Sequence, residues 1–269
     1  MTLFLRAAFH FYVAIIQNLQ TLFWSVAKVL NIKNVLLKPF PNFKFRANLK
    51  GYVAFLVYSH QPLRFFKRSF EYKVFNFIHE NTVEGDIVVD VGANVGMISL
   101  FMSSIVGKRG KVFSIEASNK NIEILNKNIE VNKINNIIII NHAVSDSEKN
   151  VFMKTPKGGY NDALLIMADS ADDNAGEPSQ SLTFDKIVEV WGINNVKLIK
   201  IDIEGAELLF FKGAENFFRN NKPFLIFETL DTYCERFGYS SIDVLLVLQS
   251  WGYKVKQLDI ETWVAYPKN

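Results

Sequence analysis

The strongest hydrophobic pattern in the chain is a short apolar run that leads into a glycine-rich turn. Residues 87–91 are β-branched apart from Asp90, which is typical of a strand buried on both faces. Gly92 and Gly96 bound the turn that follows. The apolar stretch 97–105 comes next and predicts a helix. The centre of the chain is therefore predicted to be a strand, a tight turn and a helix.

Further apolar runs alternate with stretches of helical spacing, which is typical of an α/β domain built on a parallel sheet. The last two runs are predicted to close the sheet as an antiparallel pair. Residues 156–181 are rich in glycine, proline and acidic residues, and predict a long loop, part of it a lid over the substrate. The predicted strands are 111–115, 137–140, 196–205, 223–227, 254–258 and 263–266, and the predicted helices are 71–80, 119–132, 183–191 and 240–251.

The first 80 residues follow different patterns. Residues 1–40 are mostly apolar, with polar residues recurring at spacings of three, four and seven, and predict an amphipathic helical arm. No stretch of about 18 residues is free of polar groups, so no transmembrane span is predicted. The arm either packs on the domain or a partner subunit, or lies in a membrane interface. Residues 41–80 predict a basic, aromatic β-hairpin region and a lead-in helix, and residues 81–269 predict the main domain.

Charge and cysteine content indicate which partners and which cellular location to expect. The net charge is only +3, but residues 1–70 contain ten Lys and Arg and no Asp or Glu. This basic segment favours an anionic membrane surface as partner. Nucleic acid is not favoured, because no known binding motif frames the basic residues. Cys234 is the only cysteine, which excludes a disulfide framework and indicates a cytoplasmic location, at the inner face of a membrane if the arm binds there. The sequence leaves open whether the protein forms a homo-oligomer.

The turn after residues 87–91 predicts a nucleotide-type site. It does not match the dinucleotide fingerprint, because Asn94 and Met97 stand where glycines are required. Glu116 ends the next predicted strand, 20 residues past Gly96, where an acid can bind a ribose diol. The alternative is an ordinary turn with an incidental glutamate. The pattern favours S-adenosylmethionine, with Asp90 on its ammonium group, and the predicted cofactor-binding residues are Asp90, Gly92, Asn94, Gly96, Glu116, Ala143 and Val144.

Acidic residues also gather at the ends of two later strands. Burying them is unfavourable unless they have partners or a function. Asp202 and Glu204 follow Lys200, and Glu228 ends the next strand, so the three carboxylates are expected to converge at one sheet edge. Asp202 is predicted to be the catalytic base, assisted by Glu204 or Glu228, or else Asp202 and Glu228 bind Mg²⁺. Lys200 is predicted to orient the acid or the carboxylate of the cofactor. The structural alternative is that Glu204 and Glu207 cap the helix that Glu207 opens, and that Lys200 neutralises Asp202.

Together these motifs resemble the FkbM family of S-adenosylmethionine-dependent methyltransferases over about residues 71–253. The matching segments are V-V-D-V-G-A-N-V-G from Val88, I-E-A-S from Ile115, H-A-V-S-D from His142, and K-I-D-I-E-G-A-E from Lys200. One departure is Ala117, where the family often has proline.

The resemblance implies a class I, Rossmann-like α/β fold, with a seven-stranded, mostly parallel sheet and helices on both faces. It also implies methyl transfer to a hydroxyl of a sugar, glycolipid or similar metabolite, so that the acceptor is a small molecule or a lipid-linked glycan. Two other functions stay open. One is an RNA or protein methyltransferase that uses the basic segment, and the other is a catalytically inactive, cofactor-binding assembly subunit.

Overall fold

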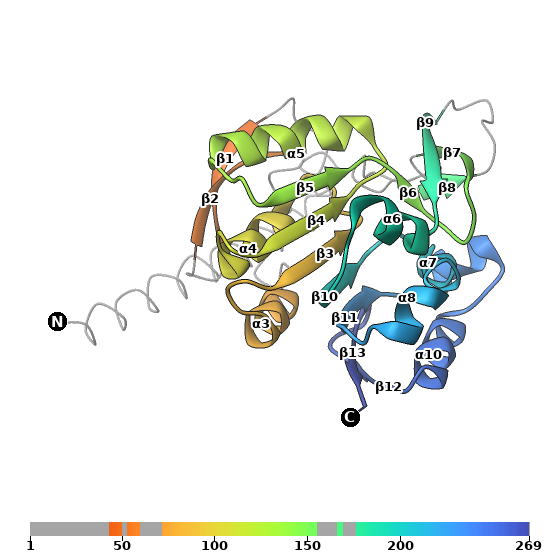
Figure 1. The fold of residues 1–269 in the computed structure, drawn as a ribbon. Coiled ribbons are helices and arrows are strands. Elements are labelled where there is room, and N and C mark those ends of the chain that lie inside the picture. Colours follow the sequence, from red (N-terminus) through yellow and green to blue (C-terminus); the bar gives the residue numbers. More distant parts are fainter. Residues whose placement is uncertain (1–42, 50–52, 60–71, 155–165, 169–175, 269) are drawn as a thin grey trace, which may run out of the picture.

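A seven-stranded sheet with helices on both faces forms the body of the chain (Figure 1). The computed structural model describes residues 43–49, 53–59, 72–154, 166–168 and 176–268. The strands of the main sheet are β3 (Ile87–Val91), β4 (Lys111–Ile115), β5 (Ile137–Ile140), β10 (Val196–Ile201), β11 (Phe224–Glu228), β12 (Tyr253–Gln257) and β13 (Thr262–Pro267).

The strand order is β12-β13-β11-β10-β3-β4-β5. The five strands from β5 to β11 run parallel, whereas β13 is antiparallel to both β11 and β12. This order confirms the predicted mostly parallel sheet and its antiparallel closing pair. The predicted strand 196–205 is too long, because β10 ends at Ile201 and the chain then turns through Gly205.

Helices cover both faces of this sheet, and each face buries its own hydrophobic cluster. Neighbouring residues of a strand point to opposite faces, so Val88 and Val89 belong to different clusters. One cluster includes residues of α3 (Tyr72–Asn81), α4 (Met97–Val106) and α5 (Asn119–Val131). The other includes residues of α6 (Phe184–Trp191), α7 (Glu207–Lys212), α8 (Glu215–Asn220) and α10 (Ser241–Ser250). The short helices α9 (Asp231–Cys234) and η2 (Glu235–Phe237) follow β11.

A second sheet stands beside the carboxyl end of β5, where the sequence predicted a loop. Its strands are β6 (Ala143–Val144), β7 (Lys149–Lys154), β8 (Ile166–Ala168) and β9 (Glu177–Leu182), in the order β6-β9-β7-β8. The loop prediction over 156–181 is therefore wrong for β8 and for most of β9. Backbone pairing with β7 makes β9 a strand, although its residues are mostly polar and include a proline. The predicted lid falls largely on residues outside the described ranges.

The N-terminal predictions are described only in part. Strands β1 (Phe43–Leu49) and β2 (Val53–Ser59) pair antiparallel and confirm the hairpin. The predicted amphipathic arm 1–40 and a third short strand at 63–66 lie outside the described residues. Within the described ranges, no helix is long and apolar enough to cross a membrane.

The turn after β3 brings two strand ends into very close contact. Gly92 has a φ of +78°, and a Cβ atom there would lie 1.9 Å from the carbonyl oxygen of Asp202. The Asp202 N–H in turn donates to the carbonyl oxygen of Val91 at 3.0 Å. Gly96 has a φ of +90°, and its Cβ would lie 2.2 Å from Leu125 Cδ1 in α5. The missing side chain of Gly92 thus lets the ends of β3 and β10 touch. The missing side chain of Gly96 leaves room for Leu125 of α5.

We predict that Gly92→Ala destabilises the protein far more than Gly238→Ala. Gly238 has nearly the same φ, +77°, but nothing lies within 4 Å of the Cβ position. The control should lose about 1 kcal/mol from the left-handed backbone alone, whereas Gly92→Ala adds a clash with backbone and should lose about 3 kcal/mol or more. Urea unfolding of both variants measures the difference. Similar losses would show that the close approach is not a constraint.

Candidate active site

A cavity of about 640 Å³ opens at the carboxyl ends of the parallel strands, where ligands of open α/β sheets bind. Its wall includes seven of the residues predicted from the sequence, namely Gly92, Asn94, Glu116, Ala143, Val144, Asp202 and Glu204. The other lining residues are Val91, Ile115, Ala117, Asn121, His142, Met153, Ile203 and Ala206. The predicted residues that do not line this cavity are Asp90, Gly96, Lys200 and Glu228.

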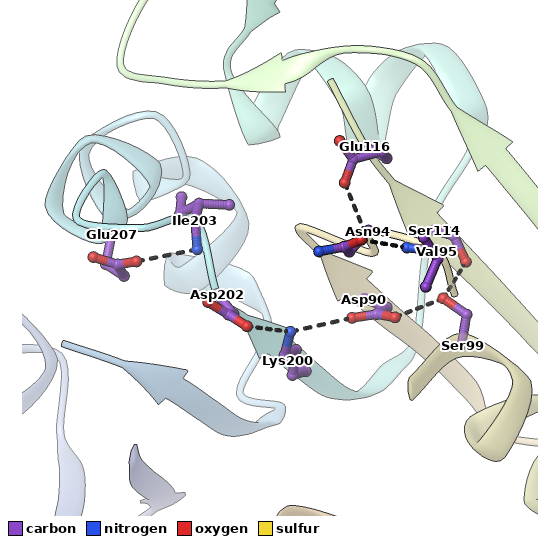
Figure 2. A network of polar contacts seen from close by, with 10 residues as sticks. All are labelled: Asp90, Asn94, Val95, Ser99, Ser114, Glu116, Lys200, Asp202, Ile203 and Glu207. Carbon is purple, nitrogen blue, oxygen red and sulfur yellow. Dashed lines mark hydrogen bonds and ion pairs between the residues drawn. The ribbon is translucent and has the colours of Figure 1, made fainter. Parts of the chain in front are cut away.

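Glu116 fixes the two turns that form one side of the cavity (Figure 2). It is 6% exposed, and its Oε2 accepts a hydrogen bond from the backbone N–H of Asn94 at 2.7 Å. Its Oε1 accepts from the backbone N–H of Ser118 at 2.9 Å and from Asn121 Nδ2 at 3.3 Å. Burial raises the pKa of Glu116, while the bonds from Ser118 and Asn94 oppose that rise. The carboxylate is therefore held at the cavity wall by donors from both turns.

Asp90 and Lys200 form a buried charged pair behind the cavity (Figure 2). They face each other in the pairing of β3 with β10, and Lys200 Nζ lies 3.9 Å from Asp90 Oδ1 and 3.0 Å from Asp202 Oδ2. Asp90 Oδ2 accepts from the Ser99 hydroxyl at 2.5 Å, which itself accepts from the Ser114 hydroxyl at 2.7 Å. Burial raises the pKa of Asp90, and the Lys200 charge opposes this. Asp90 is 0% exposed, so it acts on the cavity through Lys200 and Asp202.

A smaller, acidic hollow adjoins the cavity. It measures about 200 Å³ and shares Asp202 and Glu204 with the cavity wall. The three predicted carboxylates therefore meet at this hollow, and Glu228 is the one of them that does not line the cavity. In the part of the chain that the structure describes, no group of three or more Asp, Glu, His or Cys side chains has a metal-binding arrangement. The predicted Mg²⁺ site at Asp202 and Glu228 thus gains no support.

Glu207, the first residue of α7, is another buried acid of this region. It is 1% exposed, and its Oε1 accepts from the backbone N–H groups of Ile203 and Gly205, both at 3.2 Å. Burial raises its pKa to about 7. Its Oε2 has no hydrogen-bond partner among the described residues. The sequence placed Glu207 at the start of a helix, which is confirmed, but its burial was not predicted.

Two residues of the cavity wall have a left-handed backbone without being glycine. Asn94 has a φ of 51° and Glu204 a φ of 55°. Such conformations are unfavourable for residues with a side chain and occur preferentially at functional sites. They lie on opposite sides of the Gly92 contact, one in the turn after β3 and the other in the turn after β10.

Sequence reasoning did not assign several lining residues to the site. Asn121 follows the helix cap Ser118 by three residues, and only its contact with Glu116 reveals its role. His142 lines the cavity, and its ring lies 5.8 Å from that of Trp191. Met153 belongs to β7, which the hydrophobic pattern did not reveal, so no sequence signal could have placed it here.

The strand order and the position of the cavity define the class of protein. A parallel sheet with one antiparallel strand inserted near its edge, and a ligand cavity at the carboxyl ends, is the arrangement expected for a class I methyltransferase. The family profile of the methyltransferase FkbM domain matches residues 90–255, which is more than half of the chain. The chain therefore belongs to the FkbM methyltransferase family.

Three solved structures with a similar arrangement are distant in sequence. An FkbM methyltransferase from Methylobacillus flagellatus KT is 19% identical, with a TM-score of 0.46 over 69% of this chain and 44% of that one. An Aquifex aeolicus SAM-dependent methyltransferase is 19% identical, with a TM-score of 0.42 over 72% and 86%. A putative rRNA methylase from Clostridium thermocellum is 15% identical, with a TM-score of 0.47 over 72% and 91%. Structural similarity at this level does not identify the methyl acceptor. Among curated proteins, none matches the sequence.

We predict that Glu207 makes stability depend on pH. Its pKa rises from 4.5 to about 7 on folding, so its favourable contribution is complete below about pH 4.5 and is lost as the pH rises to about 7. In Glu207→Gln the amide oxygen can still accept the two backbone hydrogen bonds. The amide does not ionise, so the loss of stability with rising pH disappears. Relative to wild type, the variant should gain up to about 3 kcal/mol in unfolding free energy between about pH 5 and about pH 8.

Urea unfolding at both pH values measures this gain. The control is Glu215→Gln, at an exposed residue that pairs with Arg219 at 3.5 Å. A pH dependence of Glu207→Gln equal to that of wild type would contradict the assignment.

Proposed function

We propose that this protein is an S-adenosylmethionine-dependent O-methyltransferase that acts on a hydroxyl of a sugar, glycolipid or similar metabolite. The observation that carries the proposal is the cavity itself. It brings together the Gly92 turn, the Glu116 carboxylate and Asp202 at adjacent strand ends, in a chain that belongs to a methyltransferase family.

The cavity residues fit this cofactor. Glu116 offers a carboxylate to accept hydrogen bonds from a ribose diol. Ala143 and Val144, 6% and 4% exposed, offer an apolar surface for adenine. Gly92 lines the cavity, and its missing side chain lets the Asp202 backbone pack against the turn beside the ligand space. Asp90, assigned from the sequence to the cofactor's ammonium group, would need to become accessible to touch it, and we assign it instead to holding Lys200.

The chemistry needs a positioned hydroxyl and a proton acceptor. When bound, the cofactor supplies a sulfonium methyl group: its S–C bond breaks, the sulfur keeps the electron pair, and the methyl carbon bonds to the acceptor oxygen. We assign Asp202 to take the hydroxyl proton, because it lines both spaces. Lys200 engages Asp202 Oδ2 at 3.0 Å, which leaves Oδ1 for the acceptor.

The acidic hollow disfavours a phosphate-rich acceptor, so the RNA alternative receives no support from the site. Asp202 and Glu204 would face the acceptor on one side and the carboxylate-lined hollow on the other. The association with an anionic membrane surface rests on the ten basic residues of 1–70 alone. We retain it as part of the proposal, with a lipid-linked glycan as the matching acceptor.

We predict that the protein binds S-adenosylmethionine but not NAD, and that Glu116→Gln weakens this binding about tenfold or more. The amide removes the charge that would accept both ribose hydroxyls, and charged hydrogen bonds contribute about 1.5–3 kcal/mol. Isothermal titration calorimetry measures the affinities. Glu123→Gln, at an exposed residue of α5, is the matched control and should bind like wild type. Absence of binding to the wild-type protein would refute the cofactor assignment.

We predict that Asp202→Asn retains cofactor binding and lowers methyl transfer by about 10²-fold or more, the effect of removing a general base. The measurement is the transfer of labelled methyl groups to a panel of free sugars and lipid-linked glycans. Asp146→Asn, at an exposed aspartate outside the cavity wall, should transfer at the wild-type rate. Undiminished transfer by Asp202→Asn would show that Asp202 is not the base.

A further inference from the structure

Strand β9 of the second sheet is fastened to the turn between β4 and α5, which carries Glu116. Alternation along the strand places Glu177 and Ser179 on one face, and both are half-buried, whereas the residue between them is exposed. The Ser179 hydroxyl donates to the carbonyl oxygen of Ala117 at 3.1 Å. The polar side chains on this face of β9 therefore have partners at the turn.

Glu177 makes the stronger connection, because its carboxylate accepts two hydrogen bonds from the start of α5. Its Oε2 accepts from the Ser118 hydroxyl at 2.8 Å, and its Oε1 accepts from the backbone N–H of Asn119. Hydrogen bonds to an ionised acceptor are roughly twice as strong as those between neutral groups. Ser118 is 0% exposed, so its hydroxyl cannot turn to bulk water instead. Glu177 thus fixes the turn from outside.

Ser118 connects this contact to the candidate cofactor site. Its hydroxyl donates to Glu177, while its backbone N–H donates to Glu116 Oε1 at 2.9 Å. The Ser118 side chain also accepts from the backbone N–H of Asn121 at 3.4 Å, and Asn121 Nδ2 donates to Glu116 Oε1 at 3.3 Å. A change at Glu177 therefore reaches the Glu116 carboxylate through one intervening residue.

We infer that Glu177 is a positioning residue for the cofactor, which holds the turn after β4 so that Glu116 can meet both hydroxyls of a ribose. This inference rests on the proposed function. Glu177 does not line the cavity, so it acts through Ser118 and does not touch the ligand. Two simultaneous hydrogen bonds to one diol need a carboxylate whose direction is fixed before binding, because ordering it on binding would reduce the affinity.

The alternative role of Glu177 is purely structural. A carboxylate at a helix N-terminus stabilises the helix whatever binds nearby. Asp185 makes such a contact away from the cavity, where its carboxylate accepts from the backbone N–H groups of Asn216 at 3.0 Å and Phe217 at 2.7 Å in α8. Asp185→Asn is therefore the matched control, because it changes the same kind of contact at the start of another helix.

The test uses two nucleosides that differ only in the ribose hydroxyls. Adenosine carries the 2′ and 3′ hydroxyls, and 2′,3′-dideoxyadenosine lacks both. NMR titrations of the full chain give both affinities. The wild-type protein should prefer adenosine about tenfold or more, the difference expected for hydrogen bonds to a carboxylate. Glu177→Gln should lower this preference about threefold or more by weakening adenosine alone, because the amide NH₂ cannot accept a hydrogen bond.

A structural role would change stability without changing this preference. Asp185→Asn should lower the urea midpoint and keep the wild-type preference for adenosine. If Glu177→Gln also keeps the wild-type preference, whatever its stability, the inference is overturned. Should Glu177→Gln fail to fold, Ser118→Ala breaks the same contact from the other side and retains the N–H bond to Glu116. An unchanged preference in that variant would overturn the inference equally.

Calorimetry with S-adenosylhomocysteine separates this inference from the proposed function. A wild-type protein that does not bind it would refute the proposed cofactor, and the inference with it. A wild-type protein that binds it but has equal affinity for the two nucleosides would overturn the ribose assignment of Glu116 together with the inference. Binding, a wild-type preference for adenosine and the same preference in Glu177→Gln would overturn the positioning role alone.

Discussion

The buried ammonium of Lys200 is the interaction on which the candidate site depends. It lies between Asp90, which is 0% exposed, and Asp202 at the cavity wall. Removing one member of a buried ion pair leaves an uncompensated charge and is strongly destabilising. The three groups can meet only because β3 and β10 are neighbours in the sheet, and the missing side chain of Gly92 lets their ends touch. Fold and site are therefore linked through one charged contact.

This contact also divides the site into two unlike spaces. On one side, the cavity combines the single buried acid Glu116 with apolar walls, which suits a nucleoside that brings its own hydroxyls. On the other side, the smaller hollow is lined mainly by carboxylates and adjoins the cavity through Asp202 and Glu204. Asp202 belongs to both and is held by Lys200, so the group assigned to proton transfer stands at the boundary between donor and acceptor.

The sequence predicted the main sheet well because most of its strands are apolar runs, and β12 alternates apolar and polar residues. It failed for β9, whose polar residues become a strand only by pairing with β7. The sequence identified Asp90 as a site residue but did not predict which way its side chain points. Side-chain alternation places Asp90 on the sheet face that α4 covers, where the Ser99 hydroxyl donates a hydrogen bond to it. The pairing of β3 with β10 sets Asp90 opposite Lys200. Glu261 also lines the hollow, and no sequence signal placed it there, because the pairing of β11 with β13 and the bond from Thr229 N–H to its carbonyl oxygen bring it close.

Charges inside this fold do not explain its stability. A buried ion pair is often no more stabilising than apolar residues of the same volume, and Glu207 adds an unsatisfied oxygen. The two hydrophobic clusters on the faces of the sheet supply the stability that tolerates these groups. Apolar side chains would serve the sheet equally well at these positions, but they could not hold Asp202 in place. The buried charges are therefore better explained by what binds at the strand ends than by folding.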